Sequence, residues 1–139
     1  MEGGPVIFIV AVLIVAVFLF LAIKLTGRRT HKFNLEEYQT KFLRIENSLD
    51  KENSSTWSMA IINGDKLLDK ALSEMGAPGK TMGERLKKTG DKFSDINAVW
   101  RVHKLRNAIA HESDLEISYR QAATAMTVYK QALKDLGAI

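Results

Sequence analysis

The sequence predicts an all-α protein in which an up-down bundle of four amphipathic helices follows a single transmembrane helix. Two observations lead to this fold class. Residues 5–23 form an unbroken apolar run, and from residue 33 onward apolar side chains recur at the three- and four-residue spacing of helix faces. No strand-like alternation lasts for more than a few positions. Amphipathic helices joined by short links bury their apolar faces against one another, which favours a bundle.

The apolar run from Pro5 to Ile23 has the length and composition of a membrane anchor. It contains no charged side chain, and as a helix it spans about 28 Å, close to the hydrocarbon thickness of a bilayer. A secretory signal peptide would carry positive charge before a shorter apolar core, whereas Glu2 is the only charge before this run. Basic residues follow the run instead. This predicts a single-pass protein with residues 1–4 outside and the C-terminal domain in the cytoplasm.

Residues 24–33 are expected to form a basic juxtamembrane linker. Four of its cations would lie at the membrane surface and attract anionic lipid headgroups: Lys24, Arg28, Arg29 and Lys32. Without these four and Glu2, the 20 basic and 16 acidic residues become 16 and 15, so the domain that follows has a net charge of only +1. This balance does not support a broad nucleic-acid-binding face. The absence of cysteine excludes disulfides, thiolate metal sites and cysteine nucleophiles.

Residues 34–139 are expected to form the helical domain. The apolar spacing predicts helices over 34–51, 56–75, 94–111 and 118–136, with a short amphipathic turn over 82–88. Glycine inside a helix costs about 1 kcal/mol relative to alanine. Gly64, which lies within the second of these helices, therefore indicates a close helix crossing.

The first and the last of these helices carry local signals for a helix start at their N-termini. Asn34 with Glu37, and Ser118 with Gln121, have the spacing of a capping box. Phe33 and the residue five positions later, Tyr38, have the spacing of a hydrophobic staple.

Two motifs that suggest ligand binding have simpler explanations. The segment GAPGKT, residues 76–81, has Glu74 where a phosphate-binding loop requires its first glycine, and no strand precedes it. A helix C-cap and a turn explain its glycines. His103 and His111 are eight residues apart, or about 12 Å along one helix, which is too far to hold one metal ion. We expect neither a metal nor a cofactor.

The stretch KLRNAIAHES, residues 104–113, ends the third predicted helix of the domain. Turning about 100° per residue gathers apolar side chains on one side and places cationic and amide groups on the other, with no carboxylate among them. Three of these residues are candidates for catalysis: Arg106, Asn107 and His111. Three more are candidates for contacts with RNA or its phosphates: Arg101, His103 and Lys104.

This cationic side of the helix, called the strip below, suits phosphodiester cleavage without a metal. A neutral histidine accepts a proton from a ribose 2′-hydroxyl or donates one to the leaving oxygen, since histidine titrates near neutral pH. Arginine holds phosphate oxygens in a bidentate manner and stabilises the developing charge, while Asn107 orients the imidazole or the substrate. A plain polar face, or a histidine at a helix end, explains the same pattern, so the residues alone leave both interpretations open.

Arg106-Asn107, followed by three residues and His111, resembles the Arg-(Asn/Asp/His)-x₃-His motif of the HEPN family, the higher eukaryotes and prokaryotes nucleotide-binding domains. The resemblance covers about residues 34–137. It implies a homodimer in which the two motif helices face each other across a cleft. Many members are metal-independent endoribonucleases, often accompanied by an antitoxin, and the resemblance makes Arg106 and His111 the essential pair. Other members are non-catalytic dimerisation or nucleotide-binding modules.

The first functional hypothesis is therefore a membrane-anchored, metal-independent endoribonuclease that cuts RNA at the cytoplasmic face and dimerises through its third helix. The alternative is a non-catalytic adaptor, tethered to the membrane, that dimerises or binds a nucleotide. A third hypothesis is a purely structural membrane bundle. The sequence does not reveal an antitoxin or another regulatory partner.

Overall fold

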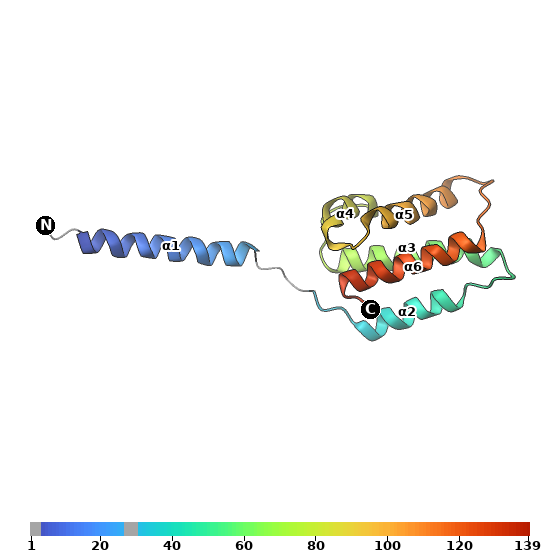
Figure 1. Ribbon diagram of the computed structural model, residues 1–139, viewed down its shortest axis with the longest axis horizontal. Coiled ribbons are helices and arrows are strands. Elements are labelled where there is room, and N and C mark those ends of the chain that lie inside the picture. Colours follow the sequence, from blue (N-terminus) through green and yellow to red (C-terminus); the bar gives the residue numbers. More distant parts are fainter. Residues whose placement is uncertain (1–3, 27–30) are drawn as a thin grey trace. The chain divides into compact units, whose positions relative to one another are not determined.

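The computed structural model describes residues 4–26 and 31–139, with side chains for 4–23 and 31–139. Within these ranges all regular structure is helical (Figure 1), which confirms the all-α prediction. The elements are α1 (Gly4–Thr26), α2 (Leu35–Asn47), α3 (Ser55–Glu74), α4 (Met82–Thr89), the 3-10 turn η1 (Gly90–Lys92), α5 (Ile96–His111) and α6 (Tyr119–Leu136). The chain divides into two compact units, residues 1–30 and 31–139.

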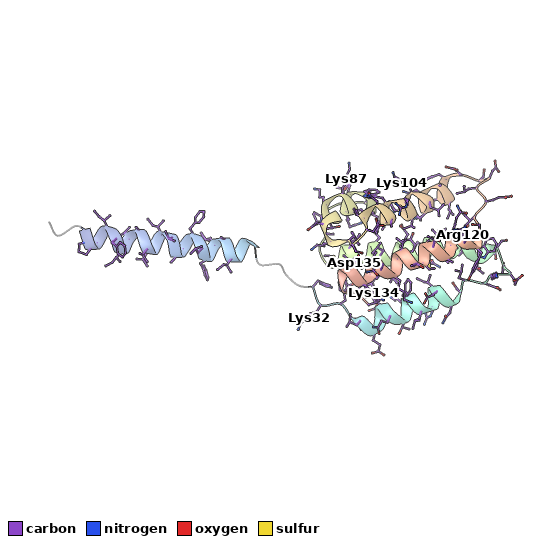
Figure 2. All side chains as sticks on the ribbon, in the orientation of Figure 1. Lys32, Lys87, Lys104, Arg120, Lys134 and Asp135 are labelled. Atoms are coloured by element: carbon purple, nitrogen blue, oxygen red, sulfur yellow. The ribbon has the colours of Figure 1, made fainter. Side chains whose placement is uncertain are left out.

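Helix α1 is long and apolar enough to cross a membrane. Its segment Gly4–Ile23 has a mean hydropathy of 3.6, and none of it is buried. A signal sequence has a similar apolar segment near the N-terminus, so the membrane span over residues 5–23 and its orientation remain proposals. Residues 1–3, Arg28, Arg29 and the Lys24 side chain lie outside the described residues, whereas Lys32 is exposed (Figure 2).

Helix α3 is the centre of the second unit. It packs against α2, α4, α5 and α6, and Figure 1 shows α2 on one side of the α3–α6 pair with α4 and α5 on the other. The largest fully buried side chains come from all of these helices except α5: Tyr38, Phe42, Ile61, Leu68, Leu72, Leu86, Tyr129 and Leu133. Because α3 contacts every other helix of the unit, a polar group on α3 can meet side chains from several of them.

The start of α2 matches its predicted signals only in part. Asn34 Oδ1 accepts a hydrogen bond from the Glu37 backbone N–H at 3.2 Å, and the Phe33 and Tyr38 rings pack edge to face with centroids 5.3 Å apart. The Glu37 carboxylate bonds to lysines instead of returning to Asn34, so only half of a capping box forms. The predicted end at residue 51 is wrong. The helix stops at Asn47, where the next hydroxyl, Ser48 Oγ, donates to the Ile45 carbonyl.

The start of α6 carries the full capping box that the sequence predicts. Ser118 Oγ accepts from the Gln121 backbone N–H at 3.2 Å, and Gln121 Oε1 accepts from the Ser118 N–H at 2.9 Å. The helix ends at Leu136, and the following Gly137 has the left-handed φ of 76° that glycine adopts without strain.

The predicted close crossing at Gly64 is confirmed. A Cβ atom at Gly64 would lie 2.8 Å from Tyr129 Cε2 and 3.1 Å from Met126 Cε, both on α6. Only a residue without a side chain lets the two helices approach this closely. The crossing also places the Tyr129 ring against the residue that follows Gly64, Asp65.

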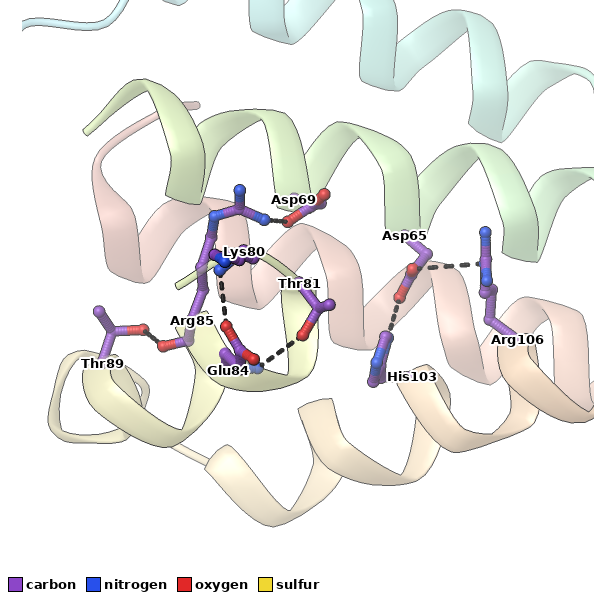
Figure 3. Close-up of polar contacts among 9 residues, drawn as sticks. All are labelled: Asp65, Asp69, Lys80, Thr81, Glu84, Arg85, Thr89, His103 and Arg106. Carbon is purple, nitrogen blue, oxygen red and sulfur yellow. Dashed lines mark hydrogen bonds and ion pairs between the residues drawn. The ribbon is translucent and has the colours of Figure 1, made fainter. Parts of the chain in front are cut away.

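The GAPGKT segment ends α3 and starts α4, as a helix C-cap and turn. Gly76 has a φ of 80°, and the Ala77 N–H donates to the Leu72 carbonyl at 2.9 Å. Thr81 then caps α4 by accepting from the Glu84 N–H at 3.3 Å (Figure 3). The short amphipathic turn expected over residues 82–88 is a regular α-helix that extends to Thr89.

Candidate functional site

The candidate site centres on the buried carboxylate of Asp65, in the middle of α3 (Figure 3). Asp65 is only 4 % exposed. Asp65 Oδ1 lies 3.0 Å from His103 Nδ1, and Oδ2 lies 3.6 Å from Arg106 Nε. Burying a carboxylate is expensive unless donors and an opposite charge compensate it. The two α5 side chains supply that compensation, so they fix α5 against α3.

Asn107 closes these contacts into a ring. Arg106 Nη1 donates to Asn107 Oδ1 at 3.1 Å, which leaves the Asn107 amide nitrogen, 3.3 Å from His103 Nε2, as a donor. This direction assigns an acceptor role to Nε2 and places the ring proton on Nδ1, from which His103 donates to Asp65. Both ring nitrogens of His103 are thereby used in hydrogen bonds inside the fold.

Tyr129, on α6, forms the floor beneath Asp65. Its ring is fully buried, and its hydroxyl lies 3.5 Å from Asp65 Oδ1. Burial, reinforced by the neighbouring Asp65 carboxylate, raises the pKa of the Tyr129 hydroxyl well above its usual range. The hydroxyl therefore stays protonated and serves as a further donor facing the carboxylate.

The expectation that His103 lies on the exposed side of its helix is wrong. Its residue is only 8 % exposed, because the carboxylate of Asp65 on α3 draws it inward and the start of α4 packs beside it. A Cβ atom at Gly83 of α4 would lie 3.9 Å from His103 Nε2. The sequence pattern of one helix contains no information about a carboxylate on another, so the strip is not free of acids.

The remaining residues expected to contact RNA are exposed. Lys104 lies on the outer side of α5 (Figure 2) and makes no ion pair among the described residues. Arg101 is also exposed, with its Nη2 atom 3.9 Å from Asp95 Oδ2. Two of the three expected phosphate contacts are therefore accessible on this helix.

His111 stands apart from the ring. It is the last residue of α5, its side chain is exposed, and among the described residues it makes no hydrogen bond or ion pair. The structure brings Arg106 and Asn107 together through the 3.1 Å hydrogen bond but joins neither of them to His111 within one chain. The three residues expected to be catalytic thus form a bonded pair and a free imidazole.

A pocket of about 470 Å³ opens beside Arg106, between α3, the start of α4 and α5. Its walls include cationic side chains from two helices and the indole of Trp100. The Arg106 side chain is 30 % exposed, so its guanidinium is within reach of a ligand there while it stays beside Asp65. Among the described residues, no group of three or more histidine, cysteine, aspartate or glutamate side chains is arranged to hold a metal ion.

The sequence contains a signal for Asp65, although this residue belongs to none of the motifs. Asp65 occupies a core position of α3, four residues after Ile61 and three before Leu68, both of which are fully buried. A charged residue in the apolar stripe of a helix is buried only with a partner. That rule predicts a cation or donor facing Asp65, although it does not say which helix supplies it.

In comparisons with known proteins, no family model, curated protein or solved structure matches the chain. The resemblance to the HEPN family therefore rests on the motif residues and their position on α5.

Proposed function

We propose that the chain is a membrane-anchored, HEPN-like, metal-independent endoribonuclease that acts on RNA at the cytoplasmic face as a homodimer. The observation that supports this best is the free, exposed imidazole of His111 at the end of the helix that holds Arg106. A side chain able to transfer protons and a guanidinium held beside a buried carboxylate can supply the proton transfer and the charge stabilisation that accelerate RNA cleavage without a metal. The finer fold, an up-down bundle of α2, α3, α5 and α6, is part of the same proposal.

The chemistry divides between the two groups. A His111 imidazole accepts the proton of a ribose 2′-hydroxyl, whose oxygen attacks the adjacent phosphorus while the bond to the 5′-oxygen breaks. Arg106 stabilises the negative charge on the phosphate oxygens, and its pairing with Asp65 holds it in place before the substrate arrives. The 5′-oxygen leaves with a proton, and the products are a 2′,3′-cyclic phosphate and a 5′-hydroxyl.

The same chemistry favours the participation of a second copy of the chain. The imidazole that has just accepted a proton is not placed to donate one on the opposite side of the phosphate in the same step. His111 of a second copy, entering across facing α5 helices, supplies that proton. A dimer also doubles the local positive charge facing the RNA, which the domain's near-neutral balance otherwise limits.

The test is an RNA cleavage assay of the full chain in detergent micelles, with EDTA present. Arg106→Ala and His111→Ala should each lower the cleavage rate about 100-fold or more. Lys87→Ala, an exposed cation on α4, is the matched control and should change the rate less than about threefold. An inactive wild-type chain, or a rate unaffected by His111→Ala, would contradict the proposal.

The membrane topology has its own test because the chain contains no cysteine. A single cysteine introduced at the exposed Ser113 reports which side of the membrane holds the domain. A membrane-impermeant maleimide should label this cysteine only after the cells are lysed. Labelling of intact cells would place the domain outside and contradict the cytoplasmic assignment.

A specific observation favours a second function, a non-catalytic adaptor. Asp65 engages both His103 and Arg106 within one chain, so much of the polar face of α5 is used to hold the fold together. In an adaptor, the exposed end of α5 would instead close a dimer or bind a nucleotide. His111→Ala would then weaken self-association in sedimentation experiments and leave RNA unchanged.

A further inference from the structure

The pocket beside Arg106 has one aromatic wall. Trp100 of α5 is partly exposed and lines this pocket, and its ring meets His103 edge to face with centroids 5.9 Å apart. Gly83 of α4 also lines the pocket, and a Cβ atom there would lie 3.7 Å from Trp100 Cη2, at an ordinary contact distance. Because Gly83 has no side chain, it takes up none of the pocket beside the indole. A flat indole next to an open pocket is a stacking platform for a flat ligand.

The other walls of the pocket carry positive charge. Lys66 of α3, Lys104 and Arg106 all line the pocket, and neither lysine makes an ion pair among the described residues. The two carboxylates of the lining are already paired. Asp65 holds His103 and Arg106, and Asp69 accepts from Arg85 Nη1 at 2.8 Å. The uncompensated charge that a ligand meets is therefore cationic.

We propose that this pocket binds one phosphorylated nucleoside unit, with the base against Trp100 and the phosphate against Lys66, Lys104 and Arg106. A nucleotide combines the two features that the walls complement, a flat ring and a phosphate dianion. An acidic peptide offers the charge without the ring. The volume of about 470 Å³ falls in the range of small-molecule sites.

This inference rests on the proposed function, since it adds a base subsite next to the arginine that would contact the scissile phosphate. The ligand is either a free nucleotide or one residue of a single-stranded RNA. Binding needs only one chain, because all the lining residues come from α3, the start of α4 and α5 of the same protomer.

Trp100 itself reports binding, since the chain contains two tryptophans. In the full-length Trp57→Phe variant in detergent micelles, all indole fluorescence comes from Trp100. Adenosine 5′-monophosphate should quench it in a saturable manner. Lys104→Ala should weaken the apparent affinity about tenfold, and Gly83→Phe, which fills the space beside the indole, should abolish quenching. The exposed Lys87→Ala variant is the matched control and should leave the titration unchanged.

A second reporter guards against a poorly folded Trp57→Phe chain. In a chain that keeps Trp57, Trp100→Phe should remove the nucleotide-dependent part of the signal. A short single-stranded RNA, titrated in a His111→Ala background, separates the two ligand sources. Affinity at least tenfold higher for RNA than for the mononucleotide assigns the pocket to an RNA residue, and equal or weaker affinity assigns it to a free nucleotide.

The absence of saturable quenching with both ligands, or quenching unaffected by Lys104→Ala and Gly83→Phe, would overturn the inference. The proposed cleavage fails separately. His111 does not line the pocket, so His111→Ala should remove cleavage and leave the quenching intact. Quenching without cleavage by the wild-type chain contradicts the nuclease proposal alone.

Discussion

Helix α5 carries two histidines whose surroundings differ in every respect that matters for chemistry. His103, in the middle of the helix, is 8 % exposed and has a hydrogen-bonding partner at each ring nitrogen. His111, at the end of the same helix, is exposed and, among the described residues, makes no hydrogen bond or ion pair. An imidazole with both nitrogens occupied holds structure together, whereas a free one can exchange protons with a substrate. Along one helix the structure thus places a buried, hydrogen-bonded histidine and an exposed histidine without a bond among the described residues.

The largest loss of stability is expected from removing the Asp65 carboxylate, to which the buried His103 is bonded. Asp65→Ala leaves His103 and Arg106 without their common partner, and loss of one member of a buried pair is expected to lower the free energy of unfolding by about 3–5 kcal/mol. Asp69→Ala is the matched control, because Asp69 pairs with Arg85 in a more exposed position. It should lower the free energy of unfolding by about 1 kcal/mol. Urea denaturation of the full chain measures both.

If the Asp65→Ala variant is too unstable to denature reversibly, a milder variant tests the same contact. Asp65→Asn keeps an acceptor for His103 and removes only the charge opposite Arg106, so its loss should lie between those of Asp65→Ala and the wild type. Equal stability of Asp65→Ala and Asp69→Ala would show that the Asp65 ring does not hold the helices together.

The two histidines themselves provide the next largest effect. His103→Ala removes the shortest hydrogen bond to the buried Asp65 carboxylate and should lower the free energy of unfolding by about 2–3 kcal/mol. His111→Ala removes a surface group and should change it by less than about 0.5 kcal/mol. His103→Asn, whose amide nitrogen can replace Nδ1 as the donor, should recover part of the loss. Similar losses at positions 103 and 111 would contradict the assignment.

The close approach of α3 and α6 around Asp65 depends on Gly64. Gly64→Ala forces a methyl group against the Tyr129 ring and should lower the free energy of unfolding by about 1–3 kcal/mol. Gly83→Ala is the matched control on α4. Its Cβ would lie at ordinary contact distances, so the helix-favouring alanine should be neutral or stabilising by up to about 1 kcal/mol. Thermal unfolding distinguishes the two outcomes, and a neutral Gly64→Ala would show that the α3–α6 crossing relaxes easily.

The smallest effect concerns ion pairs outside the site. Hydrogen bonds from Lys41 and Lys70 lower the pKa of Glu37 from its ordinary 4.5 to about 2. A lowered folded-state pKa stabilises the fold above pH 4.5, and this contribution disappears as the pH falls toward 2. The melting temperature of the wild type should therefore slightly exceed that of Glu37→Gln at pH 7 and equal it near pH 2. A difference that grows with acid would contradict this sign.

Sequence alone was sufficient where the governing physics is local. The helical periodicity, the Ser118–Gln121 capping box and the Phe33–Tyr38 staple depend on residues a few positions apart, and all three are found in the structure. Gly64 was informative for a similar reason, since an unfavourable residue inside a helix points to a contact that requires it. The end of α2 was predicted too late because the Ser48 hydroxyl donates to the Ile45 carbonyl, and such side-chain hydrogen bonds compete with continuation of the helix.

The site required information that one helix does not contain. The pattern of α5 predicts which residues share a face, and it placed His103 on the exposed one. The deciding partner, Asp65, is 38 residues away in sequence and on a different helix. Arg106 and Asn107, which the motif groups together, are neighbours in the chain and are joined by a hydrogen bond. Trp100 and Lys66 became candidates only when α3, α4 and α5 were seen to enclose one pocket.

The most direct test of the division between the two histidines is their reactivity toward diethyl pyrocarbonate, an acylating reagent that attacks accessible, unprotonated imidazole nitrogens. The full chain in detergent micelles is treated briefly at pH 7, and the modified peptides are quantified by mass spectrometry. We predict that His111 reacts at least about tenfold faster than His103, and that Asp65→Asn narrows this ratio by loosening His103. Equal rates for the two histidines in the wild-type chain would contradict the account.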